Sequence, residues 1–191
     1  MDASHKAAMI DAIAAQVQVC TRCDLYRSRS NTVPGAGNPD ADIMFVGEAP
    51  GYQEDMQGVP FVGAAGKLLD DLLAQAGIAR SDIFITNILK CRPPKNRDPG
   101  QSERSACAEF LDGQIATIRP RAICLLGRIP LQALLAPDAA ISRVHGQPVR
   151  RHGILWVPLF HPAAALHKPE YMPLLVQDMA RLKAILDNEL N

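Results

Sequence analysis

Residues 42–51 have the sequence Asp-Ile-Met-Phe-Val-Gly-Glu-Ala-Pro-Gly, and they are the clearest indication of the architecture. The first half is a short apolar run that is typical of a buried strand. The second half is a Gly/Pro-rich loop, and leucines at helical spacing follow it, at Leu68, Leu69, Leu72 and Leu73. A strand, a loop and a helix in this order predict one unit of an open α/β sheet, which binds ligands at the carboxyl ends of its strands. We therefore expect a site in this loop.

The same alternation of strand and helix continues along the chain. Apolar runs predict further buried strands at 82–86 and 122–126. Residues 148–157 predict a hairpin that turns at His152-Gly153, and its second arm is the fourth core strand. Helices are predicted over residues 5–19 (capped by Ser4 or Asp2), from Leu68 to Gly77, from Asp98-Pro99 to Ile118, and over 129–135 and 173–188. We expect an α/β fold, with three α/β/α layers around a central, mainly parallel four-stranded sheet.

Length and composition narrow the class of protein. At 191 residues, of which 48% are hydrophobic, the chain predicts a single domain over residues 1–191, and we expect a monomer. The formal net charge is zero, so any affinity for nucleic acid must come from local patches. The N-terminus does not resemble a signal peptide, and no apolar run reaches membrane-spanning length. We therefore expect a cytoplasmic protein that does not bind membranes.

Three polar loops follow predicted buried strands, namely 47–63, 87–97 and 161–168. In a parallel sheet these loops share one edge, where they would bring together a carboxylate, a carboxamide, an imidazole and a phenyl ring. A carboxamide can read the edge of a planar base, and a phenyl ring can stack on its face. The loops therefore predict a site for a planar heterocycle. A phosphate-loop interpretation of residues 63–67 fails because the spacing of its glycines is too short.

The cysteines form a second pattern. Cys20 and Cys23 are a CxxC pair, Cys91 and Cys107 lie around a predicted loop–helix junction, and Cys124 lies within a predicted strand. In a reducing compartment the first four could form a closed four-thiolate site. Their spacing allows structural zinc, an iron–sulfur cluster or a redox pair. We interpret Cys124 as a buried small hydrophobe.

Four segments resemble the iron–sulfur, or family 4, uracil-DNA glycosylases, in the same order and over nearly the whole chain. They are Gly47-Glu-Ala-Pro-Gly51, Gly58-Val-Pro-Phe-Val-Gly63, Thr86-Asn-Ile-Leu-Lys-Cys-Arg-Pro-Pro94 and His161-Pro162. The resemblance implies a DNA-repair enzyme that flips uracil out of single- or double-stranded DNA and hydrolyses its N-glycosidic bond, leaving an abasic site. It also implies a [4Fe–4S] cluster, bound by Cys20, Cys23, Cys91 and Cys107.

The resemblance further implies roles for the residues of the three loops. Phe61 stacks on uracil, Asn87 reads its pairing edge, and His161 supports the oxygen next to the departing nitrogen. The wall facing the sugar consists of Glu48 and the backbone from Gly47 to Gly51. Relatives in the wider superfamily carry an aspartate at the position of Ala49, so we assign the stabilisation of the sugar cation, or the positioning of water, to Glu48. They carry a tyrosine that blocks thymine at the position of Gly51, so thymine must be excluded by Glu54 or the Phe61 segment.

Two loops concentrate basic residues near this edge: Lys90, Arg92, Lys95 and Arg97 in one, and Arg143, His145, Arg150 and Arg151 in the other. Their position predicts contacts with DNA phosphates. Residues 163–166 resemble the superfamily's minor-groove wedge, with Leu166 as the plug, and His167 stands where a basic phosphate contact is usual. One subclass traps its product on a histidine of a comparable loop. We expect His145 instead to be a DNA-backbone or loop residue, with ordinary turnover.

The alternative from another functional class is a non-catalytic iron–sulfur protein that binds nucleic acid or transfers electrons. That interpretation leaves the convergence of Phe61, Asn87 and His161 unexplained. A zinc-stabilised nucleotide-binding protein would explain the cysteines, but the chain lacks a phosphate loop. The sequence therefore favours a uracil-DNA glycosylase that carries an iron–sulfur cluster.

Overall fold

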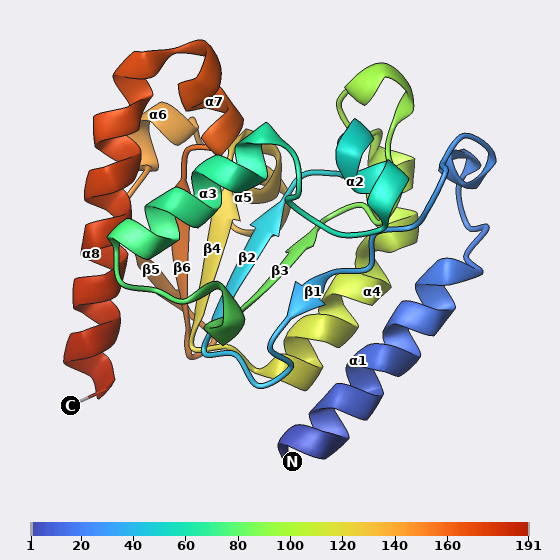
Figure 1. Ribbon diagram of the computed structural model, residues 1–191, viewed down its shortest axis with the longest axis horizontal. Helices are drawn as coiled ribbons and strands as arrows, with labels where there is room; N and C mark the ends of the chain where they lie inside the picture. The colour runs from blue at the N-terminus through green and yellow to red at the C-terminus, as the bar shows by residue number, and fades with distance from the viewer. Residues whose placement is uncertain (1, 191) are drawn as a thin grey trace.

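A central sheet of six strands organises the computed structural model, which describes residues 2–190 (Figure 1). The strands are β1 (Ala36–Gly37), β2 (Ile43–Gly47), β3 (Ile83–Asn87), β4 (Ala122–Leu126), β5 (Val149–Arg151) and β6 (Ile154–Leu159). Their order is β1-β3-β2-β4-β6-β5. The inner four pair in parallel, whereas β1 and β5 pair antiparallel at the two edges. The chain thus reverses its direction of winding at β2, and the crevice beside such a strand is where open sheets bind ligands.

Helices cover both faces of the sheet (Figure 1). They are α1 (Ala3–Gln18), α2 (Tyr52–Gln57), α3 (Ala64–Gln75), α4 (Gln101–Ile118), α5 (Arg128–Leu134), α6 (Ile141–Val144), α7 (Pro162–His167) and α8 (Met172–Leu190). Four short 3-10 turns occupy Asp24–Arg27, Arg80–Asp82, Pro94–Asn96 and Pro169–Tyr171. Helices α3 and α8 pack on one face, and α1 and α4 pack on the other. Within residues 2–190, no helix is both long and apolar enough to span a membrane.

Successive side chains of a strand point to opposite faces of the sheet, and this alternation divides the apolar core between the two faces. In β2, Ile43 and Phe45 pack with the leucines of α3 and α8, whereas Met44 and Val46 pack with α1 and α4. All five residues of β2, like those of β3 and β4, are buried. Continuous apolar runs of this kind are expected of parallel strands that are covered on both faces.

The structure confirms the three layers and the four parallel core strands, and it corrects the strand count from four to six. Strand β5 is the first arm of the predicted hairpin. Strand β1 was missed because it has only two residues, one of them glycine, and so shows no pattern of apolar residues. Helix α4 begins at Gln101, not at Asp98-Pro99. Its N-cap is Gly100, whose amide donates to the Glu103 carboxylate at 2.7 Å. The short helices α2, α6 and α7 lie in segments predicted as loops.

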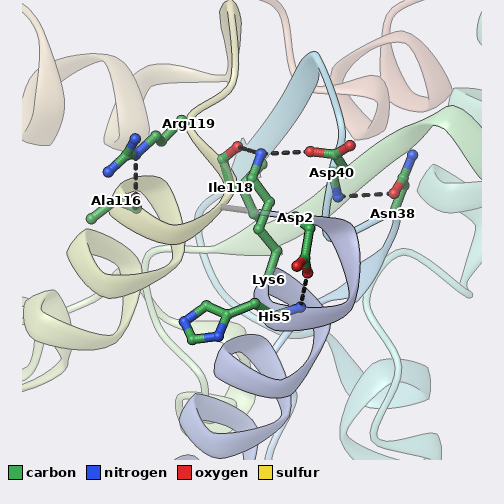
Figure 2. Close-up of polar contacts among 8 residues, drawn as sticks. All are labelled: Asp2, His5, Lys6, Asn38, Asp40, Ala116, Ile118 and Arg119. Carbon is green, nitrogen blue, oxygen red and sulfur yellow. Dashed lines mark hydrogen bonds and ion pairs between the residues drawn. The ribbon is translucent and has the colours of Figure 1, made fainter.

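The N-terminal helix is fixed to the body of the protein by polar contacts, shown in Figure 2. Asp2 is the N-cap of α1, and its carboxylate accepts from the amide of His5 at 2.8 Å. The Lys6 ammonium donates to Asp40 at 2.5 Å and to the Ile118 carbonyl at the end of α4 at 2.8 Å. These contacts set the direction of α1, whose other end leads to the CxxC pair.

Candidate active site

The three predicted loops do meet at the carboxyl edge of the sheet. Gly47 at the end of β2 is paired in register with Asn87 at the end of β3, and His161 lies two residues after the end of β6. The turn after β3 folds back on the first loop, because the amides of Ile88 and Leu89 donate to the carbonyls of Gly47 and Glu48. A Cβ on Gly47 would lie 2.4 Å from Oδ1 of Asn87 and 2.8 Å from Cζ of Phe61. Only glycine therefore fits at the point where these side chains converge.

A cavity of about 420 Å³ lies over this edge. Its lining comes from the three predicted loops and, at Ala65, from the start of α3: Glu48, Ala49, Pro50, Gly51, Glu54, Phe61, Ala65, Asn87, Pro93, Asn96, Arg97, His161 and Ala163. The volume lies within the range of small-molecule sites, and the lining mixes apolar surface with a few polar groups. The structure thus brings the predicted carboxylate, carboxamide, imidazole and phenyl ring into one pocket.

Phe61 is held in a strained backbone conformation. Its φ is 54°, in the left-handed region that a phenylalanine rarely adopts. The Glu54 carboxylate fixes the following residues, because its Oε1 accepts from the amides of Val62 and Gly63 at 2.9 and 2.8 Å. Gly66 leaves room for the Phe61 carbonyl, since a Cβ there would lie only 1.9 Å from that oxygen. The ring is thereby presented at the wall of the pocket.

The imidazole ring of His161 lies beside the ring of Phe61, and both line the pocket. The two rings lie 5.7 Å apart between centroids, with an interplanar angle of 27°. Nδ1 of His161 accepts from the amide of Ala163 at 3.1 Å, so in the neutral ring the proton is carried by Nε2. Burial lowers the pKa of His161 to about 4, although the Glu54 charge opposes this shift. The imidazole is therefore a neutral hydrogen-bond donor near pH 7.

Glu48 is the carboxylate that directly follows Gly47. Burial raises its pKa above the ordinary value, and the nearby charge of Asp98 raises it further. Arg128 and Arg104 oppose this shift, and Arg128 is itself paired with Asp98 at 2.6 Å. A partly desolvated carboxylate of this kind suits interaction with a developing positive charge or with a water proton.

None of the five cysteines forms a disulfide, and four of them line one small cavity beside the active-site edge. Cys20 and Cys23 follow α1, Cys91 lies in the turn after β3, and Cys107 lies in α4. Burial raises the pKa of Cys23, Cys91 and Cys107, in the last case to about 11. Cys124 is fully buried in β4, as predicted for a structural residue.

The donor set of this cavity fits a four-thiolate centre. The Arg29 guanidinium also reaches the cavity, donating to Sγ of Cys91 at 3.2 Å and to the Cys20 carbonyl at 2.8 Å. Within residues 2–190, no three side chains of Cys, His, Asp or Glu converge closely enough to hold one metal ion. Four thiols that line one cavity are the donor set of a four-thiolate site, which either a zinc ion or an iron–sulfur cluster can occupy.

Comparison with known proteins identifies the family. Residues 34–182 match the uracil DNA glycosylase superfamily. The chain is 46% identical over 169 residues to a type-4 uracil-DNA glycosylase of Archaeoglobus fulgidus. The aligned region covers 84% of this chain and 85% of the relative. The chain belongs to the type-4 uracil-DNA glycosylase family. Type-4 enzymes of Saccharolobus solfataricus (44% over 189 residues, covering 94% and 88%) and Thermotoga maritima (40% over 185 residues, covering 95% and 96%) give the same result.

Most residues predicted to contact DNA, among them Arg92, Arg143, His145, Leu166 and His167, do not line the pocket of this type-4 glycosylase. Leu166 and His167 are exposed at the end of α7, and Leu166 has 48% of its surface accessible. Arg143 is exposed on α6. Arg92 packs its guanidinium over the exposed ring of Tyr52, 5.2 Å from the centroid, and donates to Asn96 at 2.7 Å.

His145 is only partly exposed in this type-4 glycosylase. Its Nδ1 lies 2.8 Å from the buried carboxylate of Asp178, and its ring packs 4.5 Å from that of Phe160. A Cβ on Gly146 would lie 2.0 Å from the same carboxylate, so the turn fits closely around Asp178. These contacts hold the loop against α8.

Lys90 contradicts the prediction that placed it among the phosphate-binding residues. Its side chain is 1% exposed and donates to Thr86, Asn87 and Gln114, so it cannot reach DNA. Burial lowers its pKa to about 7, which the nearby Cys107 opposes. The sequence pattern was misleading because the turn after β3 folds back and directs this lysine into the protein.

Other residues of the site were missed at the level of sequence. Asn96 and Arg97 line the pocket, and Arg97 is held by a bidentate pair with Glu103 at 2.6 and 2.9 Å. Arg97 lay within a predicted basic loop, but nothing in the sequence indicated that it faces the pocket. Arg29 carried no signal at all, because five residues separate it from the CxxC pair.

Proposed function

We propose that the chain is a monofunctional uracil-DNA glycosylase of base excision repair, which flips uracil out of DNA and hydrolyses its N-glycosidic bond. The observation that carries this proposal is the convergence of Glu48, Phe61, Asn87 and His161 on one pocket in a chain of the type-4 family. The substrate is uracil-containing DNA, and the product is an abasic site. Extrusion of the base from the helix is required because its glycosidic bond cannot be reached within the stack.

Three residues recognise and activate the base. Phe61 stacks on the face of uracil, and the carboxamide of Asn87 pairs with its edge through one donor and one acceptor. The Nε2 proton of His161 donates to the uracil oxygen next to the departing nitrogen, where negative charge develops as the bond breaks. A neutral imidazole suits this task because it stabilises the anion by hydrogen bonding and keeps its own proton.

Glu48 acts on the sugar side. As uracil departs with the bonding electrons, the sugar acquires oxocarbenium character, which a carboxylate can stabilise. The same carboxylate can orient water for attack on the anomeric carbon and accept its proton. The side chain of Ala49 lines the pocket but has no polar group. The carboxylate nearest to the end of β2 in the sequence is therefore that of Glu48. We assign the exclusion of thymine to Glu54, whose carboxylate lines the pocket and braces the Phe61 segment.

Cys20, Cys23, Cys91 and Cys107 would hold a [4Fe–4S] cluster, which would supply a rigid link between α1, the turn after β3 and α4. The support for this assignment is the donor set of their shared cavity. We assign DNA contacts to Arg92, Arg143, His145 and His167, and the minor-groove plug to Leu166. A single domain, a monomeric state and a cytoplasmic location complete the proposal.

Incubation with an oligonucleotide that contains a single uracil, followed by alkali, tests the activity. We expect one strand break at the uracil position and none in the matched thymine oligonucleotide. Intact uracil DNA after incubation with folded protein would contradict the proposal. It would favour the alternative of a non-catalytic iron–sulfur protein that binds nucleic acid or transfers electrons.

A further inference from the structure

Lys90 occupies an unusual position for a lysine. It lies in the turn between Asn87 and Cys91, and only 1% of its surface is accessible. Its ammonium donates to Thr86 Oγ1 at 2.6 Å, to the Asn87 carbonyl at 2.8 Å and to Gln114 Oε1 at 2.8 Å. An ammonium has three protons, so these three acceptors satisfy it completely.

The acceptors come from separate parts of the fold and are themselves tied together. Gln114 projects from α4, and its Nε2 donates to the Pro34 carbonyl at 2.7 Å. The Thr86 hydroxyl donates to the same carbonyl at 2.9 Å. The backbone carbonyl of Lys90 accepts from the amide of Val33 at 2.8 Å. Lys90 therefore joins the end of β3, the C-terminal part of α4 and the segment that precedes β1.

Two functional regions lie on either side of this network. On one side, Asn87 is paired with Gly47, and its carboxamide lines the base pocket. On the other side, Lys90 lines the cysteine cavity together with Cys91 and Cys107. The ammonium therefore stands between the residue assigned to read uracil and the residues assigned to hold the cluster.

A buried cation is an expensive way to fill space. Well-packed apolar side chains of similar volume often stabilise a protein as much as a buried charge does, or more. The acceptors of Lys90 indicate a more specific task, because one of them is the backbone carbonyl of the base-reading residue itself. We propose that Lys90 is a positioning residue that fixes the backbone of Asn87, and with it the carboxamide in the pocket. This inference rests on the role proposed for Asn87.

A double-mutant cycle distinguishes positioning from general stabilisation. The variants are Lys90→Met, Asn87→Ala and the double variant, compared by single-turnover excision of uracil. If Lys90 acts through Asn87, Lys90→Met lowers the rate roughly 10- to 100-fold in the Asn87 background. In the Asn87→Ala background it lowers the rate by less than about threefold, because coupled residues are non-additive. Equal losses in the two backgrounds would overturn the inference.

Two binding measurements, with free uracil and with abasic DNA, distinguish positioning of Asn87 from a merely structural role. Lys90→Met should weaken inhibition by free uracil as Asn87→Ala does, and it should leave the affinity for abasic DNA unchanged. Visible absorbance per chain should also stay at the wild-type level. Loss of that absorbance, or parallel weakening for uracil and abasic DNA, would assign Lys90 to the cysteine turn or to stability and overturn its positioning role.

The controls keep the test decisive. Lys183→Met, on α8 at the opposite end of the sheet, applies the same substitution to a lysine outside the network and should leave all readouts unchanged. If Lys90→Met does not fold, Gln114→Leu replaces it in the cycle, because it removes one acceptor and leaves the ammonium in place. The same criterion of non-additivity then applies. An inactive wild type overturns the proposed function and this inference together, whereas additivity in an active enzyme overturns this inference alone.

Discussion

The backbone amide of Ala163 donates to Nδ1 of His161 at 3.1 Å, and this contact fixes which ring nitrogen can serve the reaction. His161 is the N-cap of α7, so the first turn of that helix supplies the amide. With Nδ1 engaged as an acceptor, the neutral ring carries its proton on Nε2. The fold therefore sets both the tautomer and the position of the donor before any substrate binds.

The first prediction concerns the protonation of His161. Its pKa of about 4 means that the ring stays neutral through the physiological range. An NMR titration should show no protonation of this ring near pH 6.5, the value of an ordinary histidine. Since the unfolded chain takes up that proton first, the stability of the fold should fall as pH decreases from about 6.5 to about 4. His161→Gln should slow excision roughly 100-fold, and titration near pH 6.5 would contradict the prediction.

Glu48 gives a prediction in which activity and stability move in opposite directions. Because the pKa of Glu48 is raised, excision should begin to fall at a higher pH, as the solution is acidified, than it would with an ordinary glutamate. Glu48→Gln should slow single-turnover excision roughly 100-fold and remove this acidic limb. Because the folded state disfavours the ionised form, the same substitution should raise the melting temperature at pH 7. Unchanged excision in Glu48→Gln would remove Glu48 from the mechanism.

Gly66 allows a test of Phe61 that leaves the aromatic ring intact. In Gly66→Ala the new Cβ would lie 1.9 Å from the Phe61 carbonyl, so the segment that carries the ring must shift. We expect excision to fall at least roughly tenfold, with weaker inhibition by free uracil. Gly113→Ala in α4 is the matched control, since its Cβ meets only the flexible end of Ile13 at 3.3 Å. It should keep full activity and gain up to about 1 kcal/mol of helix stability. Equal behaviour of the two variants would contradict the prediction.

Much of this site was predictable because strand ends carry their own signal. Apolar runs located β2, β3 and β6, and parallel pairing then required Glu48, Asn87 and His161 to share an edge. Two features had no counterpart in the sequence. The left-handed backbone of Phe61 depends on the hydrogen bonds of Glu54 with the two amides that follow it, and on the close approach of Gly66 to its carbonyl. The burial of Lys90 depends on how one turn folds back, and a run of basic residues favours the opposite interpretation.

The last prediction concerns Arg29 and the proposed cluster. Hydrogen bonds to ligating sulfurs influence the stability and reduction potential of such centres. Arg29 donates to Sγ of Cys91 at 3.2 Å, and its other contacts, with the carbonyls of Gln18 and Cys20, anchor it to the chain after α1. Arg29→Met should therefore lose visible absorbance faster in air, and its reduction potential should shift. Cys91→Ser should prevent assembly of the cluster.

Arg27→Met is the control, because Arg27 is exposed. Among the ion pairs described for residues 2–190, it pairs only with Asp24. It should retain absorbance at the wild-type rate. The two arginines lie two residues apart, so a shared loss would indicate a disturbed loop and count against a specific bond to Cys91. A loss confined to Arg29→Met, with the uracil affinity of freshly prepared protein unchanged, would support that bond. Such a result would also separate the stability of the cluster from recognition of the base, since Arg29 contacts the cysteine cavity and does not line the base pocket.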